Sequence, residues 1–230
     1  MKSKMSIFMA GFLLLVLPVV AQAMSFTFEG TANNGIGSAT LDFDISADGK
    51  IWKVYIDNTS PTTLISGPGD NISAITGFGW DVDDGSASAF TWTLAAEDEH
   101  STLQDISGSW NVGPGSTGSV VLDVFAQNNS GTAAALYNPA WAASPSTLGN
   151  TNPFFTTAIL TVNYTEPEYL RVFTESDPQD GSPFVRMQRV GYDNDGSLKL
   201  FVPEPSSMLL VGIGFIGLAI IRRRKCFRKI

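Results

Sequence analysis

The sequence predicts an all-β protein, an antiparallel β-sandwich of jelly-roll type, and three observations lead to this prediction. Apolar and polar residues alternate with a period of two along many short segments, which is the pattern of half-buried strands. Clusters of Gly, Ser, Asn and Pro separate these segments. A sustained helical period of 3.6 residues is not found between residues 24 and 202, although 95–106 could hold a turn or two of helix.

The expected strands follow one another in short runs. Leu41, Phe43 and Ile45 alternate with polar residues, and the turn at Asp48-Gly49 leads to a second alternating run at 52–56. Asp-Gly between two such runs is typical of a hairpin, because glycine readily adopts a positive φ. Eight to ten strands of this kind indicate a sandwich. The other expected strands cover 76–82, 90–94, 120–125, 158–164, 169–173, 183–190 and 198–202.

Charge is distributed unevenly along the 230 residues. The segment 24–202 contains six basic and 21 acidic residues, a net charge of −15, whereas both ends of the chain are basic and apolar. An acidic domain excludes nucleic acid as a partner, because phosphates require basic patches. One cysteine and one histidine exclude a disulfide framework and a metal site built from Cys or His. We therefore expect no cofactor, no bound metal and no catalytic residues.

The first 23 residues have the three parts of a secretory signal peptide. Lys2 and Lys4 precede an apolar run that ends at Val20, and Ala21-Gln22-Ala23 places small residues at the two positions that signal peptidase reads. We expect cleavage before Met24, which makes 1–23 the signal peptide and 24–202 the exported domain.

The chain ends in a second apolar segment. Residues 208–221 are apolar throughout, and Arg222, Arg223, Arg224 and Lys225 follow directly. Fourteen helical residues span about 21 Å, less than the roughly 30 Å hydrocarbon core of a bilayer, so a span needs a thin membrane and snorkelling arginines. The basic cluster predicts a tail in the cytoplasm and a domain outside the inner membrane.

Pro203-Glu204-Pro205 stands immediately before this apolar segment. A proline-rich junction, a short apolar helix and an arginine cluster, in this order, resemble the PEP-CTERM sorting signal of Gram-negative bacteria that produce exopolysaccharide. The resemblance implies that 203–230 is a sorting signal, that an exosortase recognises Pro203, Glu204 and Pro205, and that the protein is displayed at the cell surface or in the extracellular matrix. Exopolysaccharide is then a candidate partner.

Three kinds of chemistry in the acidic domain are alternatives to a non-enzymatic surface protein. Trp110 and Trp141 lie in Gly- or Ala-rich segments, where exposed rings could contact glycans, whereas Trp52, Trp80 and Trp92 alternate with core residues. The run Glu97–His100 is the only place where a histidine adjoins carboxylates, as a secreted hydrolase would need. Residues 81–85 and 193–196 are similar to calcium loops but fail the EF-hand spacing, and hairpin tips explain them better.

Overall fold

The computed structural model describes residues 22–83, 86–117, 120–129, 134–143, 154–172 and 183–201. Within these ranges the chain forms strands and short 3₁₀ turns, so the all-β prediction is confirmed. The described ranges contain no helix of the length and apolarity that crossing a bilayer requires, and the expected span 208–221 lies outside them. The strands are β1 (Gln22–Ala32), β2 (Gly35–Ile45), β3 (Ile51–Asn58), β4 (Ala74–Val82), β5 (Phe90–Asp98), β6 (Leu103–Asp105), β7 (Trp110–Thr117), β8 (Val120–Asn128), β9 (Leu136–Tyr137), β10 (Phe155–Tyr164), β11 (Leu170–Arg171), β12 (Phe184–Val190) and β13 (Gly196–Phe201).

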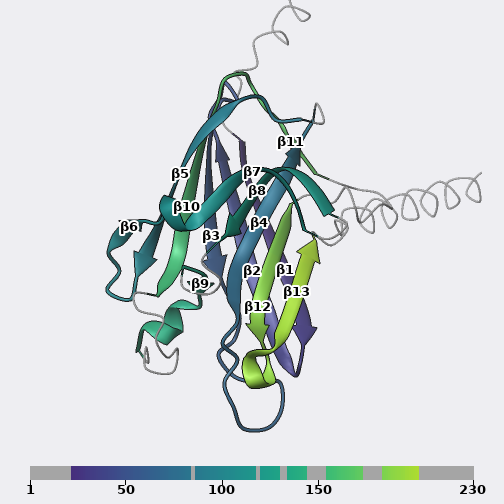
Figure 1. Cartoon of the computed structure of the whole chain (residues 1–230), viewed down its shortest axis with the longest axis vertical. Coiled ribbons are helices and arrows are strands. Elements are labelled where there is room, and N and C mark those ends of the chain that lie inside the picture. The colour runs from purple at the N-terminus through teal and green to yellow at the C-terminus, as the bar shows by residue number, and fades with distance from the viewer. Residues whose placement is uncertain are drawn as a thin grey trace, which may run out of the picture.

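The strands lie in two layers with the apolar core between them (Figure 1). One layer has the order β1-β2-β3-β10-β5-β6, and the other has the order β7-β8-β4-β12-β13. The short strand β9 pairs with both β10 and β4 and connects the layers, while β11 pairs with β4. The sheet is not closed, because β1 and β13 have one ladder partner each. This arrangement is consistent with a sandwich, and the jelly-roll connectivity stays a prediction.

The period-two pattern correctly predicts which residues face the core. Along β3 the side chains of Trp52, Val54 and Ile56 are fully buried, and the residues between them are exposed or half-buried. The neighbouring β2 alternates in the same way, with Phe43 directly opposite Val54. Each strand thus contributes one apolar face to the interior, and burial of these faces is the main stabilising term of the fold.

Aromatic rings join the two layers at the centre of the core. The rings of Trp52 and Trp80 stack with centroids 5.9 Å apart and an interplanar angle of 18°. Phe43 meets Trp80 edge-on at 5.2 Å. The indole Nε1 of Trp80 donates a hydrogen bond of 3.2 Å to Oη of Tyr164, and burial raises the pKa of this tyrosine. Paired rings and a satisfied indole nitrogen indicate a specific packing arrangement rather than a loose apolar interior.

Local signals identified some elements and missed others. The hairpin at Asp48-Gly49 is confirmed between β2 and β3, and Gly49 has a φ of 72°. The expectation of helix at 95–106 is wrong, because β5 continues to Asp98 and pairs with β6. The strand β1 is not among the expected strands, although Phe26 and Phe28 alternate with polar residues there. The sequence also does not predict that β1 lies beside β13, which it contacts without forming a ladder (Figure 1).

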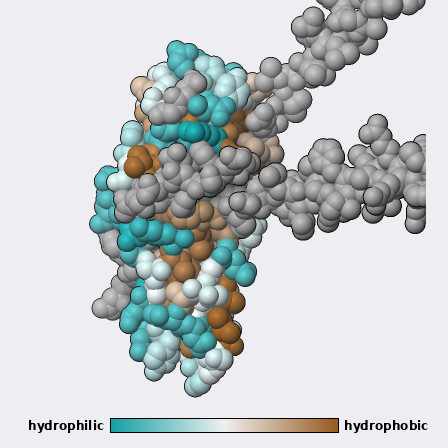
Figure 2. Space-filling model, turned by 90° about the vertical axis from the view of Figure 1, so that its right-hand side faces the viewer, coloured by the Kyte–Doolittle hydropathy of each residue, from teal (hydrophilic) through white to brown (hydrophobic). Residues whose placement is uncertain are grey.

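The open edges of the sheet carry some apolar side chains. Met24 and Phe26 on β1 and Leu198 on β13 are half-buried and pack against the core. Seen from the right-hand side of Figure 1, the molecule shows apolar surface among hydrophilic patches (Figure 2). Single half-buried apolar residues of this kind are common on folded domains.

Close approach of backbone to backbone explains one glycine of β4. A Cβ on Gly79 would overlap the carbonyl oxygen of Val124 on β8 and would lie 2.8 Å from Cδ1 of Leu122. We expect Gly79→Ala to lower the free energy of unfolding by about 1–3 kcal/mol, because the β4–β8 ladder must shift. Urea unfolding followed by tryptophan fluorescence measures this change. The matched control is Gly113→Ala on β7, where a Cβ meets nothing within 4 Å; equal losses in both variants would contradict the explanation.

Candidate functional site

The predicted sorting segment follows directly from the last strand. β13 ends at Phe201, whose half-buried ring lies 5.3 Å from the ring of Phe184 on β12. Pro203, Glu204 and Pro205 lie outside the described residues, as do Arg222, Arg223 and Arg224. Only one residue, Val202, separates the described domain from Pro203. The proposed processing site therefore begins beside the folded domain rather than at the end of a long linker.

The predicted signal-peptidase site overlaps the start of β1. Ala21 lies outside the described residues, and Ala23 is an exposed residue of β1 opposite Asp44. Met24, the expected first residue of the mature protein, is opposite Phe43. Cleavage before Met24 would remove two of the eleven β1–β2 pairs and keep nine. The structure thus places the expected N-terminus, Met24, at the third residue of β1, and the pairs from Met24 to Ala32 do not depend on the residues that are removed.

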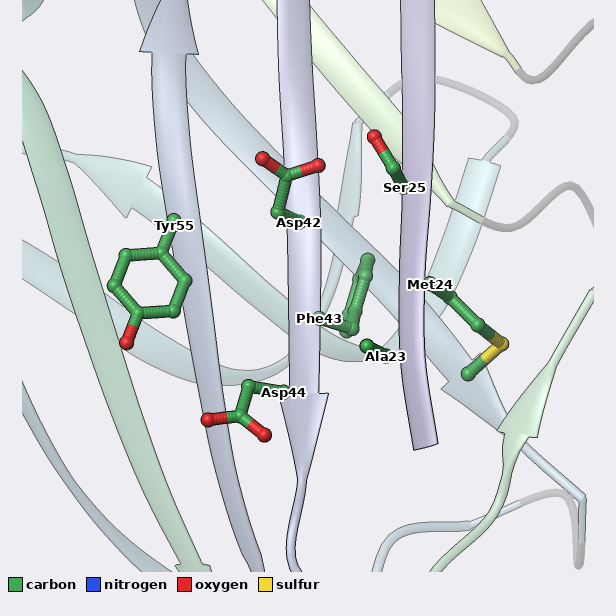
Figure 3. A pocket seen from close by; sticks show the side chains of 7 residues that line it. All are labelled: Ala23, Met24, Ser25, Asp42, Phe43, Asp44 and Tyr55. Carbon is green, nitrogen blue, oxygen red and sulfur yellow. The ribbon is translucent and has the colours of Figure 1, made fainter. Parts of the chain in front are cut away.

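A shallow cavity lies beside this site (Figure 3). Its volume is about 300 Å³, and its only charged lining groups are the carboxylates of Asp42 and Asp44 on β2. Tyr55 of β3 is opposite Asp42 and lies alongside these carboxylates. Sequence reasoning missed this pair of acids, although their alternation with the buried Phe43 places both on the outer face. Two carboxylates in an open cavity favour a cationic group over an anionic one.

The expectation that Trp110 could contact a glycan through an exposed ring is wrong. Its side chain is 2% exposed. The ring lies 5.6 Å from that of Phe78, and Nε1 donates a hydrogen bond of 3.0 Å to the carbonyl oxygen of Ala134. The Gly-rich stretch that follows Trp110 belongs to β7, which pairs with β8 and turns the tryptophan inward.

The same correction applies to Trp141. This residue is 5% exposed, lies in the 3₁₀ turn Pro139–Ala143 that follows β9, and belongs to a second apolar cluster. The other members of this cluster are Ile72, Ala74, Ala135, Tyr137 and Phe154. Among the five tryptophans, only Trp92 of β5 is half-buried, whereas the sequence places it inside. The described surface therefore does not present the pair of stacking rings that a carbohydrate-binding module was expected to use.

The run Glu97–His100 forms a turn rather than a catalytic arrangement. The side chain of His100 is 80% exposed, and its Nε2 lies 4.0 Å from Oε1 of Glu99. Oδ1 of Asp98 accepts hydrogen bonds of 2.9 Å from the backbone N–H groups of His100 and Thr102. In the described part of the chain, no hydroxyl group is hydrogen-bonded to His100. Asp98 thus closes the β5–β6 turn, which explains why a carboxylate stands there.

The lowered pKa values of three turn carboxylates, those of Asp48, Asp98 and Asp105, lead to a prediction of how the stability of the domain depends on pH. The hydrogen bond from Thr102 N–H holds the pKa of Asp98 below its usual range. Bonds from Ser46 and from Ser107 do the same for the pKa of Asp48 and for that of Asp105. A lowered folded-state pKa means that these groups contribute stability above the unfolded value of about 3.9 and lose it as pH falls through the folded value.

We therefore expect the urea midpoint to fall between about pH 4 and pH 2, and the fall to be smaller in Asp98→Asn than in the unaltered chain. Denaturation curves at a series of pH values measure this difference. Asp57→Asn, an exposed-face change on β3, is the control variant. A pH dependence that Asp98→Asn leaves unchanged would contradict the assignment.

The two segments with a loose similarity to calcium loops have structural roles. Oδ1 of Asp81 on β4 accepts a hydrogen bond from the N–H of Asp123 on β8, and Oδ2 of Asp123 accepts one from the N–H of Val82, both at 3.0 Å. Asp193 and Asn194 lie in the turn of the β12–β13 hairpin, with φ values of 57° and 58°. In the described ranges, no group of three or more His, Cys, Asp or Glu side chains could hold a metal.

Comparison with known proteins assigns the end of the chain. Neither the curated proteins nor the solved structures contain a match to this chain. Residues 201–225 match the family model of the PEP-CTERM protein-sorting motif, which begins on the last residue of β13 and includes the proline junction, the apolar run and the arginine cluster. Proteins with this motif are exported and sorted by an exosortase. On the evidence of residues 201–225, this chain is a PEP-CTERM protein.

Proposed function

We propose that the chain is a non-enzymatic protein of the cell surface or extracellular matrix that an exosortase sorts through residues 203–230. The match of residues 201–225 to the sorting motif carries this proposal. The exosortase recognises Pro203, Glu204 and Pro205, which follow β13 after a single residue. The mature product is the acidic β-domain, displayed outside a Gram-negative cell.

The precursor carries a membrane-directed segment at each end of the domain during export. The signal peptide 1–23 directs export, and signal peptidase cleaves after Ala23. The arginines at 222–224 keep the tail in the cytoplasm until the exosortase acts, in line with the positive-inside rule. The nine remaining β1–β2 pairs support a domain that stays folded after the first cleavage.

The composition of the domain supports a structural role in the matrix. Its net charge of −15 between residues 24 and 202 keeps it soluble among acidic polysaccharides. His100 is exposed, and the bonds of Asp98 are used within a turn, so neither residue favours a hydrolase. Burial of Trp110 and Trp141 removes the observation on which a carbohydrate-binding module rested.

Intact mass spectrometry of the protein from its native host tests this proposal. Surface and inner-membrane fractions are separated first, and the mass of the chain is measured in each. The expected mature species begins near Met24 and ends near Pro203–Pro205. If all of the protein retains residues 208–230 and stays in the inner membrane, sorting by exosortase is contradicted, and the chain is a single-span anchored domain.

A further inference from the structure

Two of the few basic residues of the acidic domain stand side by side. Arg186 on β12 and Lys199 on β13 are direct partners in the antiparallel ladder. Val185 and Met187 on either side of Arg186 belong to the core, so Arg186 points to the outer face of this layer. Directly opposite residues have Cβ atoms about 5 Å apart, and like charges at this separation repel each other.

The charges of this pair are not neutralised within the described part of the chain. Neither Arg186 nor Lys199 takes part in the ion pairs Lys50–Glu166 and His100–Glu99. Nζ of Lys199 donates one hydrogen bond of 2.9 Å to the carbonyl oxygen of Thr117, which leaves two of its three protons available. Nε of Arg186 is buried and has no hydrogen-bond partner. A desolvated guanidinium nitrogen without an acceptor is unfavourable.

The neighbours across the sheet are neutral. Arg186 is opposite Gly77 on its other side, and Gly77 is opposite Gln127 of β8. The adjacent row on β13 and β12 holds Ser197 opposite Gln188. A domain with 21 carboxylates thus places none in the ladder positions next to its two adjacent cations. The surface around Arg186 and Lys199 is thus positive although the domain as a whole is negative. A positive surface of this kind favours binding of an anion from outside the chain.

We propose that Arg186 and Lys199 bind one oxyanion group, a carboxylate, phosphate or sulfate, on the outer face of β12 and β13. The planar guanidinium offers its N–H groups to two oxygens of such a group, and the ammonium of Lys199 adds a second positive charge from the neighbouring strand. The bound oxyanion neutralises the repulsion between the two cations and accepts hydrogen bonds from the terminal N–H groups of Arg186.

Ligand-induced stabilisation tests this site, because a ligand that binds only the folded state raises the melting temperature. The full-length chain is purified in a nonionic detergent, and its melting temperature is followed by tryptophan fluorescence. Sodium phosphate, sulfate and glucuronate are titrated against sodium chloride at matched ionic strength. We expect a saturable increase with at least one oxyanion beyond the increase with chloride. The oxyanion that saturates at the lowest concentration distinguishes a carboxylated ligand from a phosphorylated or sulfated one.

Three variants locate the site. Arg186→Gln and Lys199→Gln are each expected to weaken the oxyanion effect by roughly ten-fold or more, since each removes a hydrogen bond to a charged group. Without oxyanion, Lys199→Gln is expected to melt close to the unaltered chain, because loss of the hydrogen bond to Thr117 opposes the relief of the like-charge repulsion. The matched control is Lys53→Gln on β3, an exposed lysine opposite Asp44, which keeps the full effect.

Two results would overturn the proposal. One is an unaltered chain that responds to phosphate, sulfate and glucuronate no more than to chloride, and this result needs no variant. The other is an oxyanion effect that persists in both Arg186→Gln and Lys199→Gln. If Arg186→Gln fails to fold, Arg186→Lys replaces it, because this change keeps the positive charge and loses the planar guanidinium. An oxyanion affinity equal to that of the unaltered chain then contradicts the role of the guanidinium. If Lys199→Gln fails to fold, Lys199→Arg replaces it, and loss of the oxyanion effect in this charge-conserving variant contradicts the role of the second positive charge.

Discussion

Replacement of Pro203, Glu204 and Pro205 by alanine is expected to stop C-terminal processing in the native host. The three residues are the recognition element of the proposed exosortase site, and proline in general favours an extended backbone. We expect processed protein to fall by at least about ten-fold, which corresponds to a loss of about 1.4 kcal/mol in recognition. The unprocessed chain then accumulates in the inner-membrane fraction, where intact mass measures the retained tail.

The control for this experiment is Pro68→Ala. Pro68 is an exposed residue in the loop before β4, far along the chain from the sorting segment. Its replacement should leave the ratio of processed to unprocessed protein unchanged. If the triple variant is processed as efficiently as the unaltered chain, residues 203–205 are not the recognition element, and the cut site must be sought elsewhere.

Asn71→Ala is expected to have the largest effect on the stability of the domain. The side chain is 1% exposed. Its Nδ2 donates hydrogen bonds of 2.7 Å to the carbonyl oxygens of Ile36 and Pro61. Its Oδ1 accepts bonds from the N–H of Gly191, at 2.8 Å, and from the hydroxyl of Ser73, at 2.9 Å. One amide thus joins β2, the loop after β3, the start of β4 and the β12–β13 hairpin.

Alanine would remove all four bonds and leave the carbonyl of Pro61 and the N–H of Gly191 without these partners, whereas Ser73 Oγ and the carbonyl of Ile36 keep a bond of 3.3 Å to each other. We expect the free energy of unfolding to fall by about 3–5 kcal/mol, measured by urea denaturation. Asn71→Asp keeps the shape but loses both donors, and we expect it to be nearly as destabilising. Asn163→Ala, at an exposed position of β10, is the control and should change stability by less than about 0.5 kcal/mol. A loss for Asn71→Ala as small as that of the control would contradict the role of this amide.

The tryptophans show why exposure cannot be inferred from the composition of a segment. Glycine and alanine around Trp110 and Trp141 indicate loops, and loops usually lie at the surface. Trp110 is nevertheless buried because it begins β7, and β8 holds that strand against the core. Trp141 is buried because it shares one apolar cluster with Ile72 and Ala74, which come from a distant part of the chain. Both outcomes depend on contacts between distant residues, which local patterns do not contain.

The sequence by itself determined the features that depend on neighbouring residues. Alternation at 41–45 and 52–56 predicts two strands and their buried faces, and Asp48-Gly49 predicts the turn between them. The order of prolines, apolar run and arginines predicts the sorting motif that residues 201–225 match. These signals are local, because side-chain period, turn geometry and a linear recognition motif all act over a few residues.

Only the tertiary structure decided which strands are neighbours and in which register. The position of Arg186 opposite Lys199 depends on the ladder between β12 and β13, and the four bonds of Asn71 depend on segments up to 120 residues apart. A shift of one residue in either ladder would exchange the inner and outer faces of a strand. The candidate anion site and the four hydrogen bonds of Asn71 therefore arise from pairing between distant strands, which burial of the whole core selects.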